Sequence, residues 1–139
     1  MSIQHNTQEI SLKAVIANVR TVTEWVDEKL EQLGCPLKVQ MQIDVAIDEL
    51  FSNIAHYAYP DGAGEACIRF SFENRTISVT FLDRGIPFNP LDLPAPDVSL
   101  SATERKPGGL GIFLVRKTMD AVDYRYESGQ NILTIQKKI

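Results

Sequence analysis

The chain has 139 residues, of which 44% are apolar and 23% charged, and its formal net charge is −4. A chain of this length commonly forms one domain and buries a sufficient core without covalent crosslinks, so we expect a single domain over residues 1–139. The negative charge and the absence of a Lys/Arg run argue against non-specific nucleic-acid binding, which requires clustered cations.

Targeting and redox features are also missing from the sequence. No apolar run approaches the roughly 20 residues that cross a bilayer, and the first residues show no charged and then apolar signal region. The two cysteines, Cys35 and Cys67, make neither a disulfide framework nor a metal-type spacing. We therefore expect a cytoplasmic protein that does not enter a membrane.

The N-terminal part of the chain predicts a short strand over residues 8–12 and then two helices. Apolar residues recur at spacings of three and four between Leu12 and Leu33, which is typical of one helix face. Gly34 and Pro36 end this helix, because glycine can adopt a left-handed cap and proline cannot continue the hydrogen-bond ladder. A second helix is expected over residues 39–58. Its inward residues are Val39, Ile43, Ile47, Leu50 and Ile54.

Further along the chain the period changes from helical to alternating. Alternation over residues 66–72 and 77–81 predicts a hairpin of two strands. A third helix is expected over 112–121, and two closing strands near 123–127 and 131–137. This order of elements predicts an α+β two-layer sandwich, with helices on one face of a mixed, mostly antiparallel sheet.

Residues 84–107 form an irregular stretch with no sustained period. They hold five of the seven prolines of the chain. A loop of this length inside a compact domain is uncommon and is often a lid or a binding segment. We expect this role here.

The second helix carries a carboxylate and an amide on one face. Glu49 and Asn53 are four residues apart and therefore point the same way, at the shoulder of the apolar stripe. The carboxylate could activate a hydroxyl, and the amide could hold a divalent cation. A solvated glutamate and a locally bonded asparagine explain the same pattern. His56 lies on the same side, where a packed histidine is the common case.

Asp83 ends a predicted strand and is followed directly by Arg84 and Gly85. An acid in this position can accept a hydrogen bond from an exocyclic amine, while the glycine allows a flat ring to approach. The alternative is an aspartate that starts a turn, as aspartates commonly do.

A glycine-rich stretch, residues 106–111, runs directly into the third helix. It reads Lys-Pro-Gly-Gly-Leu-Gly. The first amides of a helix are unpaired and carry its positive dipole end, so glycines that expose them favour phosphate binding. A plain tight turn remains possible. The spacing is not that of a P-loop, and no strand precedes it as in a Rossmann unit.

Taken together and in this order, the three stretches resemble the N, G1 and G2 boxes of the GHKL (Bergerat-fold) ATPases. This superfamily includes histidine-kinase catalytic domains, gyrase, Hsp90 and MutL. The likeness is greatest to the small anti-sigma-factor serine kinases, whose N box resembles the segment from Glu49 to His56. The resemblance covers nearly the whole chain and implies the Bergerat fold and the use of ATP and Mg²⁺.

The resemblance also implies a role for each residue of the three boxes. Glu49 would be the general base, Asn53 a Mg²⁺ ligand, and Asp83 the acceptor of the adenine amino group, with Gly85 beside the ring. Residues 86–107 would be the ATP lid. The phosphate-binding residues would be Gly108, Gly109, Leu110 and Gly111, and the charges and positions of Arg105 and Lys106 suggest contact with the γ-phosphate.

One position departs from the family pattern. The G1 box usually has a second glycine where this chain has Pro87, and proline fixes φ and removes an amide donor. The implied function is an ATP-dependent serine/threonine kinase that phosphorylates a STAS-domain antagonist, regulates transcription by partner switching with a sigma factor, and forms a homodimer. The alternative is a nucleotide-responsive binding module with little or no kinase activity. A histidine kinase is disfavoured because the chain has no dimerising, histidine-bearing helix.

Overall fold

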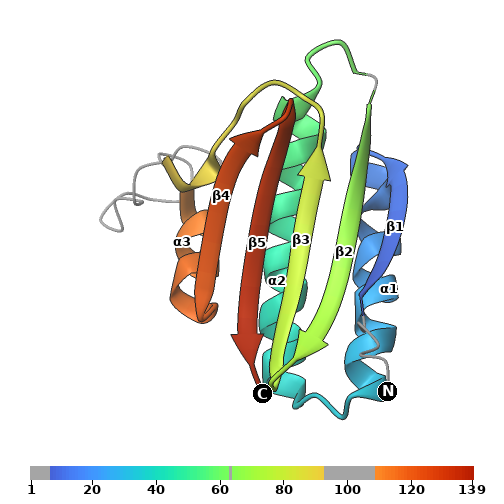
Figure 1. The fold of residues 1–139 in the computed structure, drawn as a ribbon, viewed down its shortest axis with the longest axis vertical. Helices are drawn as coiled ribbons and strands as arrows, with labels where there is room; N and C mark the ends of the chain where they lie inside the picture. The colour runs from blue at the N-terminus through green and yellow to red at the C-terminus, as the bar shows by residue number, and fades with distance from the viewer. Residues whose placement is uncertain (1–6, 63, 93–108) are drawn as a thin grey trace.

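The computed structural model describes residues 7–62, 64–92 and 109–139, and for residues 109 and 110 it describes the backbone alone. The described chain forms a five-stranded sheet with α-helices against one of its faces (Figure 1). This is the predicted two-layer α+β sandwich. The strands are β1 (Gln8–Lys13), β2 (Glu65–Glu73), β3 (Thr76–Asp83), β4 (Ala121–Glu127) and β5 (Gln130–Lys138), and the helices are α1 (Val19–Gln32), α2 (Leu37–Asn53) and α3 (Gly109–Thr118).

The strand order is β1-β2-β3-β5-β4, and all four pairings are antiparallel. The hairpin turns contain Asn74 and Arg75, with φ of 54° and 59°, and Ser128 and Gly129, with φ of 54° and 77°. Positive φ at both central residues is the geometry that matches the twist of hairpin strands. The central pairing of β3 with β5 places Asp83 directly opposite Asn131.

Helix α1 begins later than the apolar spacing predicts. Leu12 lies in β1, where it pairs with Ala66, and a 3₁₀ turn over Ile16–Asn18 precedes the helix. Pairing of β1 with β2 therefore places Leu12 in a strand, although the helical period alone would assign it to the helix. The end is as predicted: Gly34 has φ of +68°, and the amide N–H of Cys35 donates to the carbonyl of Leu30 (3.0 Å), which makes a Schellman cap.

The core lies between the sheet and the helices. Helix α2 runs behind the centre of the sheet (Figure 1) and contributes Phe51, which is 0% exposed and belongs to the same core cluster as Phe81 of β3. Trp25 of α1 packs against this core, with the Lys29 ammonium 4.2 Å from the centre of its ring.

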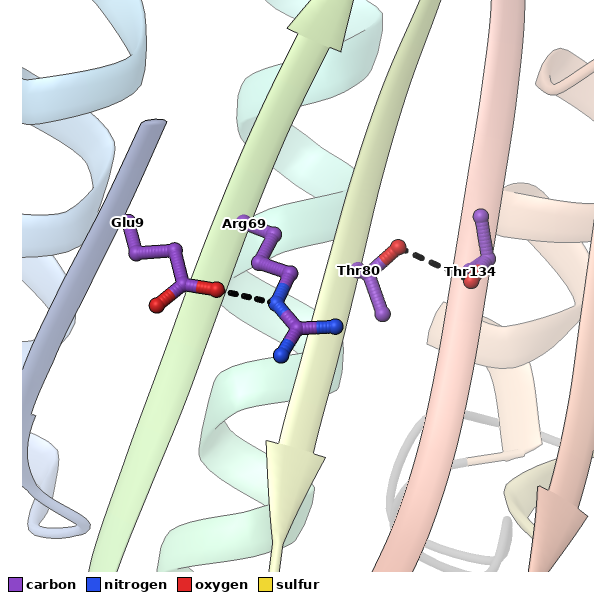
Figure 2. Close-up of polar contacts among 4 residues, drawn as sticks. All are labelled: Glu9, Arg69, Thr80 and Thr134. Atoms are coloured by element: carbon purple, nitrogen blue, oxygen red, sulfur yellow. Dashed lines mark hydrogen bonds and ion pairs between the residues drawn. The ribbon is translucent and has the colours of Figure 1, made fainter. Parts of the chain in front are cut away.

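The opposite face of the sheet carries polar contacts between neighbouring strands. Figure 2 shows Arg69 of β2 paired with Glu9 of β1, and Thr80 of β3 hydrogen-bonded to Thr134 of β5 (2.9 Å between hydroxyl oxygens). Cross-strand pairs of this kind stabilise a sheet, and no helix of residues 7–62, 64–92 or 109–139 covers this face (Figure 1).

Helix α3 is shifted toward the N-terminus relative to the prediction of 112–121. It starts at Gly109 and ends at Thr118, whose carbonyl accepts a hydrogen bond from the Lys137 ammonium (2.6 Å). Ala121 instead begins β4. Across residues 7–62, 64–92 and 109–139, no helix combines the length and apolarity needed to span a membrane.

Candidate active site

The carboxylate and amide of α2 lie together, as their spacing predicts. The side-chain amide of Asn53 donates to Glu49 Oε2 (3.3 Å), and Asn53 is only 6% exposed. Burial raises the pKa of Glu49; the hydrogen bond from Asn53 acts in the opposite direction, and the charge of Asp48 raises the pKa further. The amide oxygen of Asn53 is not used in this bond and is a suitable ligand for a hard cation.

Immediately after Asn53 the helix widens into a π-helical turn over Ile54–Ala58. Such turns occur frequently at functional sites. The turn presents the carbonyl of Ala58 to the chain after β3, where it accepts a hydrogen bond from the amide of Ile86 (2.8 Å). The exposed ring of Tyr57 lies 5.0 Å from the ring of Phe88. The end of the α2 segment is therefore attached to the post-β3 loop, residues 84–92.

Asp83 is the last residue of β3 and is 5% exposed. Its Oδ1 accepts two hydrogen bonds, from the amide N–H of Gly85 (2.9 Å) and from the side-chain amide of Asn131 (2.8 Å). Burial raises the pKa of Asp83, and both hydrogen bonds act against that effect. The carboxyl group is thus fixed through one oxygen at the edge of a buried space.

The sequence predicts a glycine at position 85 so that a flat ring can approach. In the structure, the immediate need for glycine there is contact with the backbone of Ala58. A Cβ at this position would lie 2.1 Å from the carbonyl oxygen of Ala58. Because backbone atoms do not move aside easily, no larger residue fits without displacing the loop from the π-helical turn. The glycine therefore allows close packing of the loop on the helix end. Its approach to a bound ring remains a prediction.

The glycine-rich stretch contacts the carboxylate of α2 at Gly111, in the first turn of α3. A Cβ there would lie 1.9 Å from Oε1 of Glu49, so the carboxylate rests directly against this glycine. Gly109 and Leu110 also lie in the first turn of α3. Arg105, Lys106 and Gly108, together with residues 93–107 of the expected lid, lie outside the described residues.

A pocket lies between the end of α2, the ends of β3 and β5, and the post-β3 loop. It is lined by Asn53 of α2, Asp83 of β3, Phe88 and Pro90 of the post-β3 loop, and Asn131 of β5, among others. The pocket is partly open to solvent, and the space that it leaves free is about 30 Å³, enough for one or two water molecules. A purine ring enters only if the side chains of the post-β3 loop move outward. Within the described residues, no group of three or more His, Cys, Asp or Glu side chains could hold a metal ion by itself.

Two polar pocket residues were not predicted from the sequence, Asn131 and Tyr124. The tyrosine hydroxyl donates to the side-chain oxygen of Asn131. A signal for Asn131 exists, because it occupies the inward position of a strand whose next inward residues are Leu133 and Ile135. A polar residue on an apolar strand face needs a buried partner, and here that partner is Asp83.

Comparison with known proteins identifies the family of the chain. A family model described as the histidine kinase-like ATPase domain matches residues 12–137. The serine/threonine-protein kinase BtrW of Bordetella bronchiseptica is 26% identical over 136 residues, which cover 97% of this chain and 94% of BtrW. The serine-protein kinase RsbW of Bacillus cereus is 27% identical over 93 residues, which cover 64% of this chain and 58% of RsbW.

A solved structure shares the fold. The crystal structure of the RsbU and RsbW domains of Rv1364c from Mycobacterium tuberculosis matches with a TM-score of 0.69 and 18% identity. The match covers 95% of this chain and 32% of that longer chain. With the family model spanning residues 12–137, the chain belongs to the histidine kinase-like ATPase family.

Proposed function

We propose that the protein is an ATP-dependent serine/threonine protein kinase of the anti-sigma regulatory class. The observation that carries the proposal is the convergence of the three predicted stretches: Asn53 and Asp83 line one pocket, and the Glu49 carboxylate rests on Gly111 at the start of α3. The kinase names of BtrW and RsbW support the same reaction class.

The residues present suit a nucleotide with its cation. Asp83 would accept the adenine amino group, and the backbone of residues 108–111 would hold the phosphates at the start of α3. Asn53 would offer its amide oxygen to Mg²⁺, and Arg105 and Lys106 would meet the γ-phosphate. When bound, the nucleotide supplies the phosphoryl group, and its Mg²⁺ neutralises charge that develops during transfer.

Glu49 would act as the general base. Its carboxylate lies at the start of α3, where the phosphates would be held, and it would take the proton of the attacking hydroxyl. A pKa raised by burial makes this carboxylate a stronger proton acceptor than an exposed glutamate. A positioned base typically contributes about 10²–10⁴-fold to the rate.

The partner is proposed from the family resemblance. The phosphorylated hydroxyl would belong to a STAS-domain antagonist, and the kinase would bind a sigma factor when free antagonist is scarce. It would act as a homodimer in the cytoplasm. ATP entry requires the post-β3 loop to open, because Phe88 and Pro90 line a space smaller than a base.

Transfer of radiolabelled phosphate to a STAS-domain partner tests the role of Glu49. The variant Glu49→Gln keeps the size of the side chain and loses its basicity, so we expect ATP binding to persist and transfer to fall at least 100-fold. Glu28→Gln, an exposed glutamate of α1, serves as the matched control and should transfer at the normal rate. Normal transfer by Glu49→Gln would refute the assignment.

A nucleotide-responsive binding module is the second candidate. Two observations favour it: the pocket has only about 30 Å³ of free space, and Pro87 removes an amide donor and fixes φ in the loop that must open. The same radiolabel experiment separates the candidates. ATP-dependent partner binding without any phosphate transfer by the wild-type protein would leave only the module.

A further inference from the structure

Asn131 occupies an unusual position in β5. It lies directly opposite Asp83 in the β3–β5 ladder, faces the helices, and is 5% exposed. The inward neighbours on the same strand are the apolar Leu133 and Ile135. A buried amide in such surroundings is costly unless its hydrogen bonds are satisfied.

All hydrogen-bonding positions of the Asn131 side chain are occupied within the protein. Its NH₂ group donates to Asp83 Oδ1 (2.8 Å) and to the carbonyl of Ile86 (2.8 Å). Its oxygen accepts from the backbone amide of Phe88 (3.0 Å) and from the hydroxyl of Tyr124. An amide side chain offers two N–H donors and two lone pairs, so none of these is left for a ligand.

These contacts join the two parts of the protein that would surround a base. One N–H fixes a carboxylate oxygen of Asp83, while three backbone and hydroxyl contacts tie the post-β3 loop and β4 to the same amide. Asp83 Oδ1 accepts one hydrogen bond from the side chain of Asn131 and one from the backbone amide of Gly85, so both of its lone pairs are occupied. Among the described residues, no hydrogen bond engages Oδ2.

We propose that Asn131 is a positioning residue for base recognition: it fixes the carboxylate of Asp83 through Oδ1 so that Oδ2 receives the 6-amino group of adenine. This inference rests on the proposed nucleotide site. Asn131 itself touches no nucleotide atom and acts through the acid it holds, in the way that outer groups orient the ligands of a metal site.

Discrimination between two nucleotides tests the proposal. The probes are ATP and purine riboside triphosphate, in which a hydrogen replaces the 6-amino group. A hydrogen bond to a charged group is worth about 10–100-fold in affinity, so the wild-type protein should prefer ATP by that factor in calorimetric titrations. In Asn131→Ala the preference should fall below about fivefold, and an unchanged preference overturns the proposal.

The pH dependence of ATP binding supplies a readout that a purely structural asparagine would not change. The Asn131 hydrogen bond opposes the rise of the Asp83 pKa, so its loss moves that pKa further upward. As pH is lowered, ATP affinity should therefore begin to fall at a higher pH in Asn131→Ala than in the wild type. Coinciding profiles contradict the proposal.

One further variant controls for general damage to β5, and a second replaces Asn131→Ala if that variant does not fold. Thr134→Val removes a single hydrogen bond on the opposite face of the same strand (Figure 2), so the preference for ATP should persist. Asn131→Ser keeps one donor in a shorter side chain and replaces Asn131→Ala if that variant does not fold. Its preference should lie below that of the wild type, and an equal preference overturns the proposal.

Asp83→Asn separates this inference from the proposed function. If Asp83→Asn retains the wild-type preference for ATP, the adenine assignment fails and the role of Asn131 fails with it. If Asp83→Asn loses the preference while Asn131→Ala retains it, the nucleotide site stands and only the positioning role of Asn131 is refuted.

Discussion

Replacing Asp44 with asparagine should stabilise the protein at neutral and alkaline pH. Asp44 of α2 and Asp27 of α1 form a carboxyl pair between the two helices. Oδ1 of each is buried and has no hydrogen-bond partner within the described part of the chain, so any bond between the two carboxyl groups involves Oδ2. Burial, followed by the hydrogen bond with Asp27 and the charges of Asp27 and Glu31, raises the pKa of Asp44 to about 8. The pair therefore holds a proton in the folded protein over a range in which the unfolded chain has lost it.

The sign of the effect follows from proton linkage. Between about pH 4 and pH 8 the folded state binds more protons at this pair than the unfolded state, so the free energy of unfolding falls as pH rises through this range. Below about pH 4 both states are protonated, and the pair no longer disfavours folding. Burial also raises the pKa values of Glu49 and Asp83, so part of the slope remains in any Asp44 variant.

The expected magnitude is modest. One unit of pKa difference corresponds to about 1.4 kcal/mol, but both aspartates are only partly buried and water screens much of the interaction. We therefore expect Asp44→Asn to gain about 1–2 kcal/mol at pH 8 relative to the wild type, and about 0 at pH 4. This gain corresponds to a rise in Tm of roughly 3–8 °C.

Urea denaturation at a series of pH values measures this difference. Asp48→Asn, an exposed aspartate of the same helix, is the matched control and should change stability by less than about 0.5 kcal/mol at every pH. A gain for Asp44→Asn that does not depend on pH, or a loss of stability at pH 8, would refute the shared-proton interpretation.

Two further predictions concern the site and the core. Gly111→Ala places a methyl group where Glu49 Oε1 now lies, and the flexible carboxylate can move away from it. Because the base is then displaced, we expect phosphate transfer, measured with radiolabelled ATP, to fall at least 10-fold. The Tm, measured by thermal unfolding, should stay close to the wild-type value. Phe51→Ala removes a ring that is 0% exposed in the core and should cost about 3–5 kcal/mol in urea denaturation; a loss below about 1 kcal/mol would mean that this core is not packed as described.

The fold could be predicted from the sequence because its signals are periodic. Alternation marks β2 and β3, three-and-four spacing marks α1 and α2, and Gly34 forms the helix end that glycine predicts. The start of α1 could not be placed in the same way, because Leu12 fits both a helical stripe and a strand edge. Pairing of β1 with β2 decides between them, and that pairing is a long-range contact.

The candidate site was predicted only in part. Glu49 and Asn53 are neighbours on one helix, so their contact follows from local geometry. The bond from Asn131 to Asp83 depends on the register of β3 against β5, which no local pattern specifies. Likewise, the π-helical turn after Asn53 has no composition signal, and the need for glycine at position 85 becomes visible only when the Ala58 carbonyl is in place.

The most direct test of the nucleotide site is a crystal structure of the protein with Mg²⁺ and a non-hydrolysable ATP analogue. We expect the post-β3 loop to be open, the adenine amino nitrogen to lie within about 3.2 Å of Asp83 Oδ2, and the phosphates to lie at the start of α3 beside Glu49. A nucleotide bound elsewhere, or a base whose amino group makes no contact with Asp83, would contradict it.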